Sequence, residues 1–152
     1  MKKCFFIIAM CYNVILLSQI NEFKVIFSID ESIVIPENIS DIRFLDFETH
    51  QKIDYDVGGL YLLDSLYQEV LKLESVRIAF RYYHPCLGIK EYTLSLGVDY
   101  LRQRYLLVNF FDFELKSNQK KFKVKTGFGY EIISPLGTYS LPRSKRFRKK
   151  CI

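Results

Sequence analysis

The sequence predicts a mainly β protein folded as a two-sheet antiparallel sandwich. Apolar and polar residues alternate with period two in several segments, as they do where successive side chains of a strand point to opposite faces. Turn-forming residues separate these segments at intervals of about ten residues. The chain has 152 residues, of which 49% are hydrophobic, and a chain of this length can bury a core without a metal or a disulfide. We expect a single folded domain.

The chain opens with a segment that has the layout of a secretory signal. Two lysines follow Met1, and then come an apolar run from Cys4 to Leu17 and the small residue Ser18. A basic start, a short apolar stretch and a small residue at the cleavage point are typical of such a signal, so we expect residues 1–18 to be removed on export. The run is shorter than the roughly 20 residues that a membrane-spanning helix needs. This disfavours the alternative of a membrane-anchored accessory subunit.

The body of the protein spans residues 19–142, and no repeat or linker divides it. Near its start, residues 23–28, 32–35 and 42–47 are rich enough in apolar and β-branched side chains to form short strands. Acidic residues and a proline separate these segments, which indicates turns between them.

Residues 60–73 depart from the strand pattern. Leu63, Leu66 and Val70 recur at helical spacing among polar side chains, and two glycines precede them. The spacing predicts a helix whose apolar stripe covers one end or face of the sandwich. An irregular edge strand is the alternative.

A pair of longer strands follows. Residues 76–82 and 92–98 both alternate clearly between apolar and polar side chains. The loop between them contains Pro85, which cannot donate a hydrogen bond in a sheet. We expect two strands joined by this loop.

A second long pair lies nearer the C-terminus. Most of residues 105–111 are apolar on both parities, as in a central strand that is covered on both sides. A buried helix is the alternative. Residues 122–132 alternate between apolar and charged side chains. The polar stretch 116–120 predicts a turn, so the two strands should pair antiparallel. Seven short strands in all are typical of an immunoglobulin-like or transthyretin-like sandwich.

Few residues in the chain are suited to catalysis or to metal binding. The two histidines, His50 and His84, fall in expected loops and lack the short ligand spacing of a zinc site. Cys86 lies two positions from His84, but neighbouring positions in one loop seldom aim at each other as a nucleophile and its base must. We therefore expect no catalytic centre, no metal and no cofactor. The alternative is a secreted hydrolase whose acid and base are carboxylates brought together by the fold.

Removal of residues 1–18 leaves two cysteines, Cys86 and Cys151. In an oxidising compartment this pair is a candidate disulfide. Cys151 is the penultimate residue of a charged tail, however, so free thiols or pairing between molecules are the favoured alternative.

The strongest local feature is the basic C-terminal tail, residues 143–152. The chain has a formal net charge of +5, and the last ten residues contain six cations: Arg143, Lys145, Arg146, Arg148, Lys149 and Lys150. Residues 19–142 hold 14 basic and 17 acidic residues, so the basic character belongs to the tail. Such a run attracts polymers that bear phosphate or carboxylate groups. A solvated tail that aids solubility is the alternative.

These features predict an exported, non-enzymatic binding or envelope-associated module of the periplasm or cell surface. An exported protein meets anionic lipid, lipopolysaccharide or acidic glycan before nucleic acid, so we expect the tail to contact one of these. The absence of tryptophan and the abundance of Phe and Tyr favour an AT-rich bacterial genome. Exposed aromatic rings would favour sugar binding. Tyr83 and Tyr100 both lie near expected loops, and the sequence does not choose between them.

Overall fold

The computed structural model describes residues 20–47 and 53–144. Its strands are β1 (Ile20–Phe23), β2 (Val25–Ile29), β3 (Ser32–Ile33), β4 (Ile39–Phe44), β5 (Asp54–Asp56), β6 (Gly59–Leu63), β7 (Ser75–His84), β8 (Gly88–Gly97), β9 (Leu106–Asp112), β10 (Phe128–Ser134) and β11 (Gly137–Tyr139). Its short helices are η1 (Pro36–Asn38), α2 (Asp64–Val70), α3 (Val98–Leu101) and α4 (Lys116–Phe122). The expected leader, residues 1–18, lies outside the described residues.

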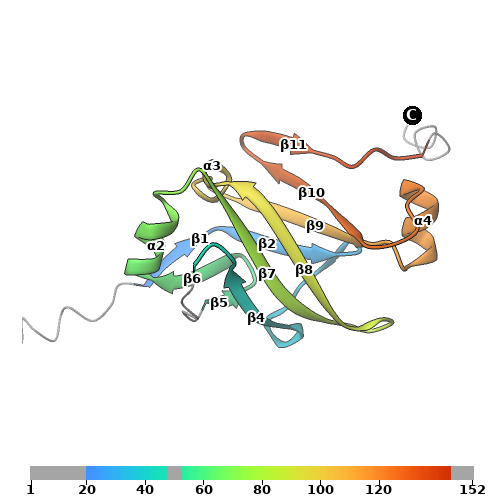
Figure 1. Ribbon diagram of the computed structural model, residues 1–152, viewed down its shortest axis with the longest axis horizontal. Helices are drawn as coiled ribbons and strands as arrows, with labels where there is room; N and C mark the ends of the chain where they lie inside the picture. The colour runs from blue at the N-terminus through green and yellow to red at the C-terminus, as the bar shows by residue number, and fades with distance from the viewer. Residues whose placement is uncertain (1–19, 48–52, 145–152) are drawn as a thin grey trace, which may run out of the picture.

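The strands of the described residues form three sheets. One has the order β1-β6-β5, the second β11-β10-β9-β2-β3 and the third β4-β7-β8. β7 and β8 cross the face formed by β2 and β9, and α2 lies at one end of the molecule with the small β1-β6-β5 sheet (Figure 1). α4 lies at the opposite end, beside the last described residues (Figure 1).

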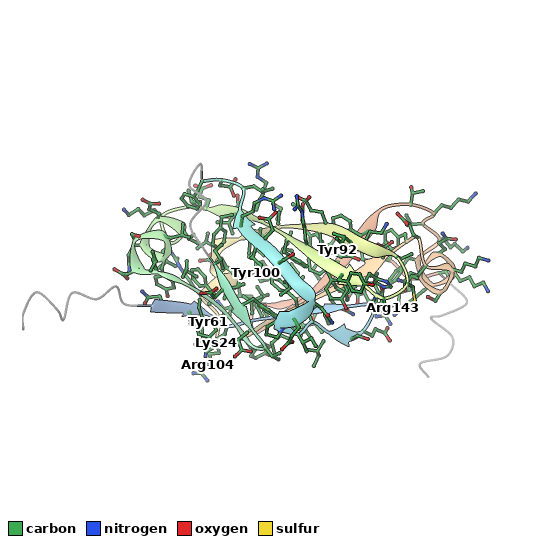
Figure 2. All side chains as sticks on the ribbon, turned by 90° about the horizontal axis from the view of Figure 1, so that it is seen from below. Lys24, Tyr61, Tyr92, Tyr100, Arg104 and Arg143 are labelled. Carbon is green, nitrogen blue, oxygen red and sulfur yellow. The ribbon has the colours of Figure 1, made fainter. Side chains whose placement is uncertain are left out.

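The core between the two larger sheets is aromatic. Phe27, Phe80 and Phe110 come from β2, β7 and β9, are buried, and have ring centroids 4.9–6.2 Å apart. Tyr92 of β8 is buried against Phe80 and Phe110 and lies between the sheets (Figure 2). Burial of each such side chain stabilises the fold by roughly 1.5–3 kcal/mol. The apolar residues that alternate along the strands are therefore the residues that form this core.

The predicted β-sandwich is confirmed, with two differences of detail. A third, smaller sheet is present, and β2 pairs parallel with β9, with Val25 opposite Leu106 and Ile29 opposite Phe110. We expected antiparallel pairs only. Parallel strands are joined by long crossover connections, which turn signals between neighbouring segments do not reveal. The immunoglobulin-like or transthyretin-like type stays a prediction.

Both predicted pairs of long strands are present. β7 and β8 pair antiparallel with Tyr83 opposite Ile89, and their connecting turn contains Pro85, as expected. β9 and β10 also pair antiparallel, with Phe110 opposite Tyr130.

The helix predicted over residues 60–73 is shorter than expected. Leu60 and Leu62 belong to β6, which pairs with both β1 and β5, and both side chains are buried. Only α2, from Asp64 to Val70, is helical, and it buries Leu66 and Val70. Pairing with two partner strands thus overrides the helical spacing in the first part of this segment.

The turn predicted at 116–120 is wrong, because these residues form α4. Phe122, expected in a strand, is the last residue of this helix, and Val124 follows in the loop before β10 begins at Phe128. The helix forms because Asn118 and Phe122, one turn apart, are both buried against the sheet.

No helix of the described residues is long and apolar enough to cross a membrane.

Candidate anionic-surface site

Helix α4 is held in place by one aromatic and one polar side chain. The ring of Phe122 lies 4.7 Å from that of Phe111 and 5.8 Å from that of Phe113, centroid to centroid. The side-chain amide of Asn118 donates to the backbone carbonyl of Asp112 at 2.8 Å and to the carboxylate of Asp30. These contacts fix one face of the helix against the sheet and leave the remaining faces to solvent.

The solvent side of α4 and the loop after it carry lysines. Four of them, which we call the lysine surface, are exposed and have no ion-pair partner among the described residues: Lys116, Lys120, Lys123 and Lys125. Their charges are therefore uncompensated by this fold. Like charges held this close together attract counterions, so such a surface favours a polyanionic partner.

The fifth lysine of this region, Lys121, forms an ion pair within the fold. Its Nζ lies 2.5 Å from the carboxylate of Glu31 and 4.6 Å from the centre of the Phe111 ring. The hydrogen bond and the charge of Lys121 hold the pKa of the Glu31 carboxyl below its usual range. Lys121 thus ties the helix to the β2–β3 turn and contributes little net charge to the surface.

The segment from Leu141 to Ser144 joins the tail to this helix. The backbone amide of Ser144 donates to the carbonyl oxygen of Lys121 at 2.9 Å. Leu141 packs against the phenylalanines that hold α4, and its amide donates to Glu131 Oε1 at 3.2 Å. The basic tail therefore continues from a residue that lies against α4.

An ion pair and the absence of a side chain at Gly129 also hold residues 141–144 in place. Arg143 Nη2 lies 3.3 Å from Glu131 Oε2, and the Glu131 side chain is only 9% exposed. A Cβ at Gly129 would lie 2.8 Å from Leu141 Cδ1 and 2.9 Å from Phe113 Cζ. Leu141 can therefore approach β10 only because residue 129 is a glycine.

Of the six predicted tail cations, the structure describes only Arg143. It lies at the end of the molecule that carries α4 (Figure 2), and its pairing with Glu131 makes it an anchor for the tail. The predicted residues Lys145, Arg146, Arg148, Lys149 and Lys150 lie outside the described residues. The structure adds the lysine surface, of which the sequence pattern placed Lys116 and Lys120 in a turn and Lys123 and Lys125 on the charged side of a strand. Its sequence signal is that residues 115–130 contain five lysines and no acidic residue.

The structure gives His84 three hydrogen-bond partners. Its Nδ1 accepts from the amides of Cys86 and Leu87 at 3.1 and 3.2 Å, and its Nε2 lies 3.1 Å from Asp30 Oδ2. An Nδ1 that accepts hydrogen bonds carries no proton, so the neutral ring donates through Nε2 to Asp30. Both nitrogens are engaged, and His84 serves to hold the β7–β8 turn against the β2–β3 turn.

The carboxylates of Asp30 and Asp112, near His84, also accept hydrogen bonds from groups of the fold. Asp30 Oδ1 accepts from the backbone amide of Asp112 at 3.1 Å as well as from Asn118. Asp112 Oδ2 accepts from the hydroxyl of Tyr92 at 3.2 Å, and its Oδ1 accepts from the amide of Glu114 at 2.8 Å. These bonds satisfy groups that would otherwise be buried without partners.

The cysteine pairing stays a prediction. Cys86 is exposed and carries a free thiol in the described residues. Cys151, its expected partner, and His50 lie outside the described residues.

Comparison with known proteins adds no assignment. No protein-family model matches the chain, and neither the curated proteins nor the solved structures contain a match.

Proposed function

We propose that this protein is an exported, non-enzymatic binding module that docks on anionic lipid through the lysine surface and the adjoining tail. The observation that carries the proposal is the hydrogen bond from the Ser144 amide to the Lys121 carbonyl. It holds Ser144, from which the basic tail continues, against the helix that carries part of the lysine surface.

The charges of this surface support attraction to a membrane. Each basic residue near an anionic bilayer contributes about 1 kcal/mol, and the effect falls off within a Debye length. The lysine surface has four uncompensated cations on a fixed scaffold. The sequence adds Lys145, Arg146, Arg148, Lys149 and Lys150 immediately beyond it. We expect the lysine surface and the tail that continues from Ser144 to meet an anionic bilayer together.

An apolar side chain among these charges favours lipid over a soluble polyanion. Val124 is 41% exposed and lies between Lys123 and Lys125 in the loop after α4. Phe147 lies between two arginines in the tail sequence. Apolar residues flanked by cations are typical of segments that lie in a bilayer interface, where the charges meet headgroups and the apolar groups enter the acyl boundary.

The arrangement around His84 disfavours a catalytic pair of Cys86 and His84. Its Nδ1 accepts from two backbone amides and its Nε2 bonds to Asp30. A general base needs a nitrogen free to take a proton from a reacting group. His84 would have to give up part of the turn that it holds before it could act in this way.

Sedimentation with vesicles tests the proposal. The purified protein, with its N-terminus determined by mass spectrometry, is mixed with vesicles of phosphatidylglycerol or of phosphatidylcholine at two salt concentrations. We expect binding to phosphatidylglycerol only, weakened by salt. The double variant Lys120→Gln/Lys125→Gln should lower the affinity by about 30-fold, which corresponds to two cations.

A matched control removes two cations elsewhere. Lys72 and Arg104 are exposed, and Arg104 lies in the other half of the molecule from Arg143 (Figure 2). Lys72→Gln/Arg104→Gln changes the net charge equally and should leave binding nearly unchanged. An equal loss of vesicle affinity in the two double variants would contradict the proposal. Binding to soluble heparin or DNA without binding to vesicles would also contradict it. A mass that includes residues 1–18 would contradict export with cleavage.

A further inference from the structure

A hollow lies on the outward face of the β4-β7-β8 sheet. Its volume is about 310 Å³, and its lining includes Glu37, Asn38, Ser40, Arg81, Tyr83 and Ile89. Ligand pockets span about 300–1,000 Å³, so this hollow is large enough for a small ligand only. Its lining combines apolar side chains with several polar ones.

The register of the sheet explains why these side chains meet. Ser40 of β4 lies opposite Arg81 of β7, and Ile89 of β8 lies opposite Tyr83. Arg81 and Tyr83 are two residues apart on one strand and so share a face. Their neighbour Tyr82 faces the core, where it is buried. The hollow is therefore built on β4, β7 and β8, at a point where the pairing of β4 with β7 shifts register after Ser40, and the η1 turn lies at its border.

Tyr83 and Ile89 supply an apolar wall that is open to solvent. Tyr83 is 60% exposed and Ile89 is 74% exposed. Tyr100, the alternative ring that the sequence left open, is half-buried and packs against the core. The structure thus chooses Tyr83 as the exposed ring.

The polar groups of the hollow offer both donors and acceptors. Arg81 Nε is 3.6 Å from Asp41 Oδ2, which is longer than a hydrogen bond, and Asp41 already pairs with Arg43 at 2.5 Å. The guanidinium therefore retains donors for a ligand. Glu37 supplies acceptors, and the Asn38 amide supplies both kinds of group. One cation and one anion among the lining side chains leave no net charge to favour an ionic ligand.

We propose that this hollow binds one sugar unit of a neutral saccharide, with Tyr83 stacking on the sugar ring and Arg81, Asn38 and Glu37 bonding its hydroxyls. A hydroxyl both donates and accepts, so a row of hydroxyls matches this mixed set of groups. The C–H face of a pyranose is apolar and flat enough to lie on a phenol ring. None of the residues that line the hollow belongs to the lysine surface.

Nuclear magnetic resonance titration tests this inference. Neutral tetrasaccharides of glucose, mannose and N-acetylglucosamine are added in turn to the purified full chain. We expect at least one of them to shift the amide signals of Ser40, Tyr83 and Ile89. Tyr83→Ala should weaken its binding by at least about tenfold, and Asn38→Ala should weaken it to a lesser degree.

Two controls make the outcome specific. Tyr105→Ala removes another ring that is 48% exposed and should leave saccharide binding unchanged. Lys120→Gln/Lys125→Gln should also leave it unchanged, so failure of the lipid proposal and of this one can be told apart. The inference is overturned if no tetrasaccharide shifts these amides, or if Tyr83→Ala binds as well as the unmodified protein.

Discussion

The side-chain amide of Asn118 on α4 donates a hydrogen bond to the carboxylate of Asp30, 88 residues earlier in the chain. The same carboxylate accepts from the backbone amide of Asp112 and bonds to the ring of His84. Asp30 is thus the point where α4, β9 and the β7–β8 turn meet. It occupies a positive-φ conformation, with φ 50°, which is uncommon for a residue other than glycine and is held here by its side-chain bonds.

Asn118→Ala should destabilise the protein by about 1–3 kcal/mol, because it removes a buried donor to a carboxylate and to the Asp112 carbonyl. Urea unfolding gives the free energy of unfolding. Ser117→Ala, an exposed position on the same helix, serves as the control and should change it by less than about 0.5 kcal/mol. Equal effects of the two variants would show that Asn118 does not hold the helix.

Glu31→Gln tests the ion pair with Lys121. The pKa of Glu31 is lowered in the folded protein by its hydrogen bond to Lys121, so the pair stabilises above the unfolded pKa of about 4.3. This stabilisation is lost as the pH falls through the lowered folded value. The variant should be less stable by up to about 1 kcal/mol near neutral pH. The difference should vanish in strong acid, when both chains are neutral at this position.

The same variant should bind anionic vesicles more tightly than the unmodified protein, because it releases the charge of Lys121 beside the lysine surface. Vesicle sedimentation measures this change. Reduced stability together with reduced binding would contradict the role that we assign to Glu31.

Gly129→Ala should destabilise the protein by about 1–3 kcal/mol, because the added methyl group would collide with Leu141 and Phe113. Loss of the Leu141 anchor should also weaken vesicle binding, since the tail would no longer start beside α4. Gly97→Ala is the matched control, because the nearest atom to its new Cβ is an ordinary 3.7 Å away. Differential scanning calorimetry compares the two, and equal shifts in Tm would refute the close approach at Gly129.

Tyr92→Phe should lower the free energy of unfolding by about 0.5–1.5 kcal/mol near neutral pH, because it removes the hydrogen bond to Asp112. Burial raises the pKa of Tyr92, and the nearby charge of Asp112 raises it further. The unfolded chain therefore ionises first, near pH 10, and the native protein loses stability as the pH rises beyond that value.

Tyr92→Phe lacks this loss of stability at alkaline pH. The difference in free energy of unfolding between the unmodified protein and the variant should therefore shrink above about pH 10. Ultraviolet titration provides a second measurement. The Tyr92 phenol should ionise only when the protein unfolds, because its pKa is raised in the folded state. A deficit that grows with alkaline pH would contradict the raised pKa.

Much of the sandwich was predictable, because its strands obey a local rule. β7 and β8 alternate between buried and exposed residues along their length, and that alternation is visible in the sequence. β9 is buried on both faces near Phe110 and Phe111, as its continuous apolar run indicated. Pro85 marked the turn between β7 and β8 because it cannot take part in a sheet.

The errors have a different physical origin. Leu60 and Leu62 fit either period, and only pairing of β6 with two neighbours made them a strand. Residues 116–122 form a helix because Asn118 finds Asp30 and Phe122 finds Phe111. Asp30 lies 88 residues before Asn118, so a sequence window around α4 does not contain this contact.

The sequence by itself determined which residues enter the core, where most turns fall and that cations crowd the C-terminal region, because periodicity and charge are local properties. Only the tertiary structure decided that the tail starts beside α4, that β2 runs parallel to β9, and that Tyr83 rather than Tyr100 faces solvent next to Arg81. Each of these depends on contacts between segments that are distant in the chain, and such contacts form only when the whole core assembles.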